Sequence, residues 1–157
     1  MTRKARVLID TDVFVIDLRY HRDPKYSQNR TFLERVKQEE LVGRITVYNL
    51  MEVCGILSFN LSPQSLEELF IGFATKYNVE ILFPPDEEER TCFNPVDILE
   101  TMKQKFSFGD ALIAELVQRY KGRLDLFVTW NAVHFADKLP LRVITPAQGK
   151  AESELNS

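Results

Sequence analysis

The chain has 157 residues, of which 45% are hydrophobic and 27% are charged. This length and composition are typical of one compact globular domain, and they argue against an intrinsically disordered or fibrous chain. The apolar runs are far shorter than the ~20 residues of a membrane-spanning helix, and the basic start lacks the apolar stretch and cleavage site of a signal peptide. The two cysteines, Cys54 and Cys92, have no metal-ligand spacing. We therefore expect a cytoplasmic protein with reduced thiols and no membrane association.

The net charge is −3 at pH 7, which does not by itself indicate a polyanionic partner such as nucleic acid, although charge can be segregated on a surface. Basic residues do gather in short groups. Each group taken alone is more typical of a solvated face or a helix end than of a binding patch. The groups are Arg3, Lys4 and Arg6; Arg19, Arg22 and Lys25; Lys103 and Lys105; and Arg119, Lys121 and Arg123.

Short apolar runs with the character of buried strands recur along the chain, at residues 6–9, 44–47, 79–83, 126–129 and 142–145. Between them lie segments with the helical spacing of apolar residues. This alternation predicts an α/β fold, a three-layer α/β/α sandwich with a central, mainly parallel sheet. We expect residues 1–148 to form a single domain and residues 149–157 to form a flexible C-terminal tail.

The predicted helices carry start and stop signals. Ser62 and Asn94 are candidate N-caps, and each is followed by a proline at the first helical position. A later helix, which begins near Asp110, places its apolar residues on one face and is expected to end at Gly122.

Two carboxylates directly follow the first predicted strand, in the sequence VLIDTDVFV. In open α/β sheets, ligands bind in the crevice beyond the carboxyl ends of the strands, and Asp10 stands at such an end. A carboxylate against an apolar strand end must be solvated, hydrogen-bonded or paired with a cation. Asp12 is better explained as a strand terminator or a helix N-cap, so Asp10 is the stronger candidate for a functional site.

Glu52 is the one charged residue between Ile45 and Ser65. The predicted helix around it is apolar nearly all round, which predicts burial. A lone buried glutamate is costly unless a partner or an ion compensates for its charge. A structural ion pair with a distant arginine would explain Glu52, but service in a functional site is the better explanation.

Two later segments place polar groups at comparable positions. Asp110 begins the helix DALIAELVQRY, where Ser107-x-x-Asp110 also resembles a capping box and an acidic residue suits the helix dipole. On a helical wheel Asp110 lies at the edge of the apolar stripe, so it can face a crevice. In LFVTWNAVHF, a predicted strand ends in Thr129 and is followed by Asn131, whereas His134 is better explained as a packing or hydrogen-bonding residue.

Four polar residues are thus predicted to lie near the carboxyl ends of strands in one sheet, each on a separate element. They are Asp10, Glu52, Asp110 and Asn131. Carboxylates that share a small site raise one another's pKa unless a cation is present. Oxygen ligands select hard ions, Mg²⁺ or Mn²⁺, over zinc. Such an ion stabilises phosphoryl charge and lowers the pKa of a bound water. The residues therefore predict metal-dependent phosphoryl chemistry.

The segments that hold these residues resemble, in order and spacing, the four motifs of PIN domains, and above all those of the VapC-type toxin ribonucleases. The segments are VLIDTDVFV, ITVYNLMEV, FGDALIAEL and LFVTWNAVHF. DALIA with the later TWN-x-x-HF is the most telling pair, and the resemblance spans about residues 6–147. It implies a PIN-like α/β/α fold and a metal-dependent endoribonuclease acting on RNA. It also implies a homodimer and, as in toxin members of the family, an antitoxin partner that covers the cleft.

The resemblance further implies a role for each residue. Asp10 and Asp110 match the principal metal ligands. Glu52 and Asn131 match the positions that hold a metal, a water or the scissile phosphate, and Thr129 helps to fix the site. The predicted metal ligands are accordingly Asp10, Asp110 and Glu52, and all three are predicted to be catalytic together with Asn131.

Two positions depart from the family pattern. Asp12, a further supporting residue, stands where the family usually has Asn, and Asn131 is uncharged where some members carry Asp. These departures bear on the number of metal ions rather than on the reaction class. For contacts to RNA phosphates we look to Arg19, Arg22, Lys25, Lys103 and Lys105.

Two alternatives stay open. Asp10-Thr11-Asp12 also resembles the first motif of the haloacid-dehalogenase phosphatases, but there the Thr/Ser strand motif precedes the Gly-Asp motif, whereas here LFVT follows Gly109-Asp110. The second alternative is a PIN-like module that binds RNA or protein without cleavage. The joint presence of three carboxylates argues against it.

Overall fold

The computed structural model describes residues 3–85 and 93–148. Five strands form one sheet in the order β3-β2-β1-β4-β5, and every neighbouring pair is parallel. The strands are β1 (Arg6–Ile9), β2 (Val42–Thr46), β3 (Val79–Leu82), β4 (Leu126–Val128) and β5 (Arg142–Ile144). The helices are α1 (Thr11–Arg19), α2 (Tyr26–Lys37), α3 (Val47–Leu57), α4 (Pro63–Tyr77), α5 (Pro95–Met102), α6 (Phe108–Tyr120), the 3-10 turn η1 (Lys121–Arg123) and α7 (Ala132–Phe135). The five predicted strands are confirmed, with small shifts at their ends.

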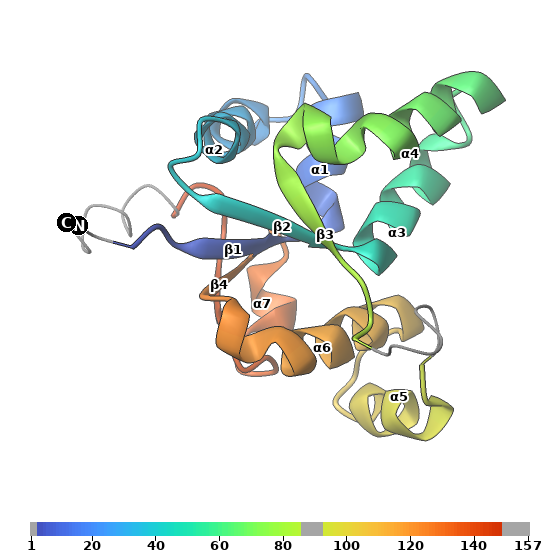
Figure 1. Ribbon diagram of the computed structural model, residues 1–157, viewed down its shortest axis with the longest axis vertical. Helices are drawn as coiled ribbons and strands as arrows, with labels where there is room; N and C mark the ends of the chain where they lie inside the picture. Colours follow the sequence, from blue (N-terminus) through green and yellow to red (C-terminus); the bar gives the residue numbers. More distant parts are fainter. Residues whose placement is uncertain (1–2, 86–92, 149–157) are drawn as a thin grey trace.

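The sheet is the middle of three layers (Figure 1). Helices α1 to α4 cover one face, and α5, α6 and α7 cover the other. Side chains alternate along β1 accordingly, because Val7 and Ile9 pack with the first group of helices and Leu8 with the second. The predicted α/β/α sandwich around a parallel sheet is therefore confirmed, with strands buried on both faces.

The predicted helix starts are confirmed, and one predicted end is wrong. Ser62, Asn94 and Ser107 each cap a helix by accepting a hydrogen bond from a backbone N–H in its first turn. Helix α6 ends at Tyr120 and tightens into η1, which contains Gly122. No described glycine has a positive φ, so Gly122 is not the left-handed C-cap that the sequence suggested.

Two sequence-based predictions fall outside the described part of the chain. The tail at 149–157 and Cys92 are not among the described residues. Within 3–85 and 93–148, no helix is long and apolar enough to cross a membrane.

The order of the strands creates a switch point between β1 and β4. From β1 the chain turns to α1 on one face of the sheet, and from β4 it turns to α7 on the other (Figure 1). Ile9 and Val128 are partners in register at the ends of these strands. The N–H of Asp10 donates to the carbonyl of Val128 at 2.9 Å. Asp10 and Thr129 therefore leave the sheet side by side, where open α/β sheets bind ligands.

Candidate active site

Asp10 lies at the carboxyl end of β1, and its carboxylate is nearly buried, with 7% of the residue exposed. It is the N-cap of α1, because its Oδ1 accepts from the N–H of Thr11 at 2.8 Å. Its Oδ2 accepts from the hydroxyl of Thr129 at 2.8 Å. The N-cap role considered for Asp12 thus belongs to Asp10, and these hydrogen bonds hold the Asp10 carboxylate at the switch point.

Asp12 lies in the first turn of α1 and points back to the end of β4. Its Oδ2 accepts from the backbone N–H of Trp130 at 3.0 Å and lies 3.2 Å from the hydroxyl oxygen of Thr129. Its Oδ1 is buried and has no hydrogen-bond partner among the described residues. A buried carboxylate oxygen without a donor is costly. The oxygen is therefore a ready ligand for a cation.

The two carboxylates raise each other's cost of ionisation. Burial, and then the charge of Asp12, raise the pKa of Asp10 from 3.8 to about 7, against the hydrogen bond from Thr129 that lowers it. Burial likewise raises the pKa of Asp12, against hydrogen bonds from Thr129 and from the backbone N–H of Trp130. A cation bound between the two side chains would remove this cost by favouring their charged forms.

A buried network that the sequence did not reveal fixes Asp10 from the side of α3. The amide of Asn49 donates to Oδ1 of Asp10 and to the hydroxyl oxygen of Thr11, both at 3.0 Å. The hydroxyl of Thr46, the N-cap of α3, donates in turn to Oδ1 of Asn49 at 2.6 Å. Asn49 and Thr46 are both fully buried. Their sole signal in the sequence is a pair of short polar residues at the start of an apolar helix.

Glu52 is exposed, so the prediction that it is buried is wrong. Helix α3 is apolar in sequence but buries one face only, with Leu50, Val53, Cys54 and Leu57 inward and Met51 55% exposed. Glu52 lies beside that inward face. It nevertheless joins the Asp10 network, because its Oε2 accepts from the hydroxyl of Thr11 at 2.7 Å.

Asp110 lies in the first turn of α6 and is partly exposed. Its Oδ2 lies 3.1 Å from Nε2 of His134 on α7. The ring of His134 packs edge-on against Phe106, with 5.7 Å between ring centroids. His134 is thus a packing and hydrogen-bonding residue, as expected. The hydrogen bond of the Asp110 carboxylate runs to His134, not to the Asp10 network.

Asn131 follows β4, as predicted, and Thr129, the predicted last residue of the strand, comes directly after its end at Val128. Thr129 is fully buried and contacts both Asp10 and Asp12. Asn131 is exposed, and its backbone N–H donates to the hydroxyl oxygen of Thr129 at 3.0 Å. The structure therefore brings Asp10, Asp12, Thr129 and Glu52 into one hydrogen-bonded group, with Asn131 joined to it through its backbone.

The residues fit a hard divalent ion in part. Among the described residues, no three His, Cys, Asp or Glu side chains lie close enough together to hold a metal ion. Two carboxylates of the right chemistry do meet, however. A cation that prefers oxygen ligands would give Oδ1 of Asp12 a partner. It would also lower the raised pKa of Asp10 by favouring the charged form of that carboxylate. Asp10 and Asp12 are therefore the core of the candidate metal site.

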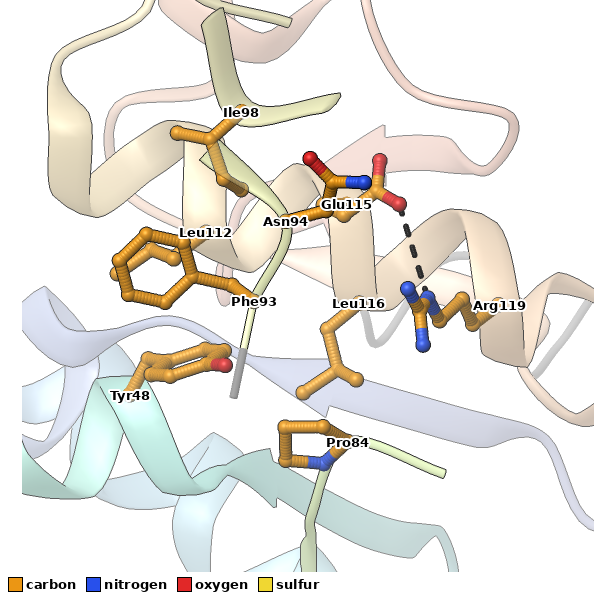
Figure 2. A pocket seen from close by; sticks show the side chains of 9 residues that line it. All are labelled: Tyr48, Pro84, Phe93, Asn94, Ile98, Leu112, Glu115, Leu116 and Arg119. Atoms are coloured by element: carbon orange, nitrogen blue, oxygen red, sulfur yellow. Dashed lines mark ion pairs between the residues drawn. The ribbon is translucent and has the colours of Figure 1, made fainter. Parts of the chain in front are cut away.

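A small hollow beside α5 and α6 is lined by none of the candidate site residues. Figure 2 shows it between Tyr48 of α3, Pro84 and the facing sides of α5 and α6. Its rim includes an ion pair between Glu115 and Arg119, with 3.6 Å between the charged atoms. Its volume of ≈ 10 Å³ is about that of one water-sized probe.

Several solved structures resemble the chain, among them the following three. A chain of VapBC2 from Rickettsia felis, bound to a DNA fragment from the promoter, matches with a TM-score of 0.58 and 16% identity over 89% of this chain and 98% of its own. VapC20 from Mycobacterium tuberculosis, described as a sarcin-ricin loop cleaving toxin, matches with a TM-score of 0.54 and 12% identity over 83% and 93%. A chain of FitAcB from Neisseria gonorrhoeae matches with a TM-score of 0.59 and 16% identity over 89% and 97%.

These matches establish the class of fold. The chain has the PIN-domain fold, and the expectation of a VapC-like PIN fold is confirmed. No protein-family model matches the chain, and no curated protein is similar to it in sequence. The likeness therefore lies in the arrangement of the elements.

Proposed function

We propose that this protein is a metal-dependent endoribonuclease that hydrolyses RNA phosphodiester bonds, and that it is the toxin of a toxin–antitoxin pair. One observation carries the proposal. The carboxylates of Asp10, which is buried, and Asp12, which is partly buried, both contact the hydroxyl of Thr129 at the switch point of a PIN-domain sheet, and one oxygen of Asp12 has no partner among the described residues. The resemblance in fold to a toxin that cleaves the sarcin-ricin loop supports RNA as the substrate.

The residues of the site have separate roles in this proposal. Asp10 and Asp12 hold Mg²⁺ or Mn²⁺, with Glu52 and Asp110 as the further predicted ligands. When bound, the ion would supply charge stabilisation to the phosphate and a water of lowered pKa. Thr129 holds the inner carboxylates in place, and Asn131, exposed at the rim, contacts the water or the scissile phosphate.

The proposal extends to the partners of the protein. The matched VapBC2 structure is a complex bound to promoter DNA, and FitAB is also solved on a DNA fragment. By analogy, an antitoxin protein covers the cleft of this chain and silences it. We further propose a homodimer, a single domain over residues 1–148, and activity in the cytoplasm.

Cleavage of a labelled structured RNA tests the proposal. The purified protein is incubated with Mg²⁺, with Mn²⁺ or with EDTA, beside the Asp12→Asn and Asp110→Asn variants. Asp97→Asn, an exposed position in the first turn of α5, is the matched control. We expect fragments that require the metal, that disappear in the two site variants and that persist in the control.

Three outcomes would count against the proposal. Cleavage that persists in EDTA or in Asp12→Asn would contradict a metal-dependent site built on this pair. No cleavage of any RNA, with no shift of the melting temperature by Mn²⁺, would favour a PIN-like binding module without catalysis. Hydrolysis of a generic phosphomonoester would favour the phosphatase alternative, since a nuclease of this kind does not need that activity.

A further inference from the structure

Trp130 is the one tryptophan of the chain, and it is fixed beside the carboxylate pair. Its backbone N–H donates to Oδ2 of Asp12 at 3.0 Å. Its indole N–H donates to Oδ1 of Asn29 at 2.7 Å, and the Asn29 amide, fully buried, donates to the carbonyl of Val13 at 2.8 Å. All polar groups of the indole are thus satisfied within the protein. The aromatic ring stays partly exposed next to the site.

Lys25, an exposed residue at the start of α2, lies against this ring. Nζ of Lys25 lies 5.6 Å from the centroid of the Trp130 ring. Arg19, the last residue of α1, and Arg22, in the segment that follows, are also exposed. A hollow of ≈ 440 Å³ opens along residues 19–23. None of these cations forms an ion pair with a described carboxylate, whereas other arginines do. The paired ones are Arg3, Arg6, Arg30, Arg35, Arg44 and Arg119.

A binding site for single-stranded nucleic acid combines an aromatic ring with basic side chains. Bases stack on aromatic rings without regard to sequence, and Lys and Arg follow the phosphates. The segment from Arg19 to Lys25 carries three basic residues and one acidic residue, Asp23, within a chain of net charge −3. Positive charge is therefore gathered at this edge of the candidate site.

We propose that Trp130 stacks a base of the RNA strand next to the scissile phosphate, and that Lys25 and Arg22 contact the adjoining phosphates. The inference rests on the proposed nuclease function and adds to it the form of the substrate. A base inside a duplex is already stacked on both faces, so the ring selects an unpaired segment such as a loop or an end. Lys25 moves from the ring to a phosphate when the base arrives.

Intrinsic fluorescence tests the inference directly, because Trp130 is the sole tryptophan. The protein in EDTA, where the proposed cleavage does not proceed, is titrated with a ten-nucleotide single-stranded RNA. Anisotropy of a labelled copy of this RNA measures its binding independently. We expect saturable quenching by the single strand, weaker quenching by a duplex of the same sequence, and none by inorganic polyphosphate, which has charge but no bases.

Variants separate the two contacts. Trp130→Leu should weaken binding by about tenfold, in the range of one lost base stack. Lys25→Gln should weaken binding several-fold, with full quenching at saturation and a salt dependence reduced by about 0.7 in slope. Lys76→Gln is the matched control, because Lys76 also lies over a ring, that of Tyr77, at 5.8 Å. Tyr77 lies in α4, just before β3, whereas Trp130 follows β4, and β2 and β1 lie between these two strands.

Failure of this inference is distinguishable from failure of the nuclease proposal. RNA binding without fluorescence quenching, or wild-type affinity for RNA in Trp130→Leu, would overturn the stacking site. The nuclease proposal would still stand if the same RNA were cleaved in the presence of metal. Absence of binding in EDTA would also overturn the stacking site. If the wild-type protein neither bound this RNA nor cleaved it in the presence of metal, both the stacking site and the nuclease proposal would be overturned.

Discussion

The hydroxyl of Thr129 donates to Oδ2 of Asp10 at 2.8 Å and lies 3.2 Å from Oδ2 of Asp12. This contact ties the end of β4 to the end of β1 at the switch point of the sheet. A hydroxyl has one proton, so it cannot donate fully to two carboxylates at once. With both side chains ionised, one oxygen would face the hydroxyl oxygen without a proton between them. A bound cation, or a proton on Asp10, resolves this conflict.

Thr129→Val tests the role of that hydroxyl. Valine keeps the shape of the side chain but removes the donor to Asp10 and the acceptor for the N–H of Asn131. We expect a loss of about 1–3 kcal/mol in the free energy of unfolding, measured by urea denaturation, and a fall in RNA cleavage. Thr129→Ser keeps the hydroxyl and should retain most of both. Equal activity in the valine and serine variants would contradict the role.

The pH dependence of stability tests the raised pKa of Asp10. Its pKa of about 7 in the folded protein lies above the ordinary value of 3.8, so the unfolded state loses its proton first. Asp10 therefore lowers the stability of the metal-free protein as pH rises from about 4 to 7. In EDTA, we expect Asp10→Asn to raise the melting temperature more at pH 8 than at pH 5.

Asp125→Asn is the control of opposite sign. The hydrogen bond from Arg6 holds the pKa of Asp125 well below its usual range, so this carboxylate stabilises the folded protein above the ordinary pKa of an aspartate and loses that effect as pH falls. Its substitution should therefore lower the melting temperature at pH 8. If Asp10→Asn also lowered the melting temperature at pH 8, as Asp125→Asn should, the raised pKa of Asp10 would be refuted.

Asn49→Ala tests the network behind the site. The change removes the donor to Asp10 and Thr11 and leaves the hydroxyl of Thr46 without its acceptor. We expect a lower kcat with little change in KM, because the change acts on the position of the carboxylate and not on an RNA contact. Steady-state cleavage measures both constants. Asn60→Ala, an exposed position after α3, should leave kcat unchanged; a similar loss there would point to general destabilisation.

Glu52→Gln separates stability from function. Glu52 is exposed and touches the network through the hydroxyl of Thr11, so its charge contributes little to folding. We expect an almost unchanged melting temperature and a fall in metal-dependent cleavage of at least tenfold. Glu67→Gln, an exposed position on α4, is the control. Unchanged cleavage in Glu52→Gln would remove this residue from the site.

The fold and the place of the site follow from local patterns in the sequence. Alternating apolar strands and capped helices predict a parallel sheet, and a carboxylate at the end of a strand must then lie at its carboxyl edge. The exposure of Glu52 could not be predicted in this way. An apolar helix in sequence buries one face, and which face it buries is decided by helices that pack from elsewhere in the chain.

The hydrogen-bond network around Asp10 could not be predicted from the sequence for a related reason. Asn49 and Thr46 are short polar residues that resemble a helix cap, and Thr46 does cap α3. The contact of Asn49 with Asp10 joins positions far apart in sequence and exists only once β1 and β2 lie side by side. The link from Asn29 to Trp130 is of the same kind, since nothing near either residue in the sequence indicates the other.

Binding of Mn²⁺ to the purified protein at pH 7.5, measured by calorimetry, tests most directly whether the Asp10–Asp12 pair is a cation site. We predict that the wild type binds the ion, that Asp10→Asn and Asp12→Asn each weaken binding by at least tenfold, and that Asp97→Asn binds as the wild type does. Wild-type affinity in both site variants, or no binding by the wild type, would contradict a nuclease built on these carboxylates.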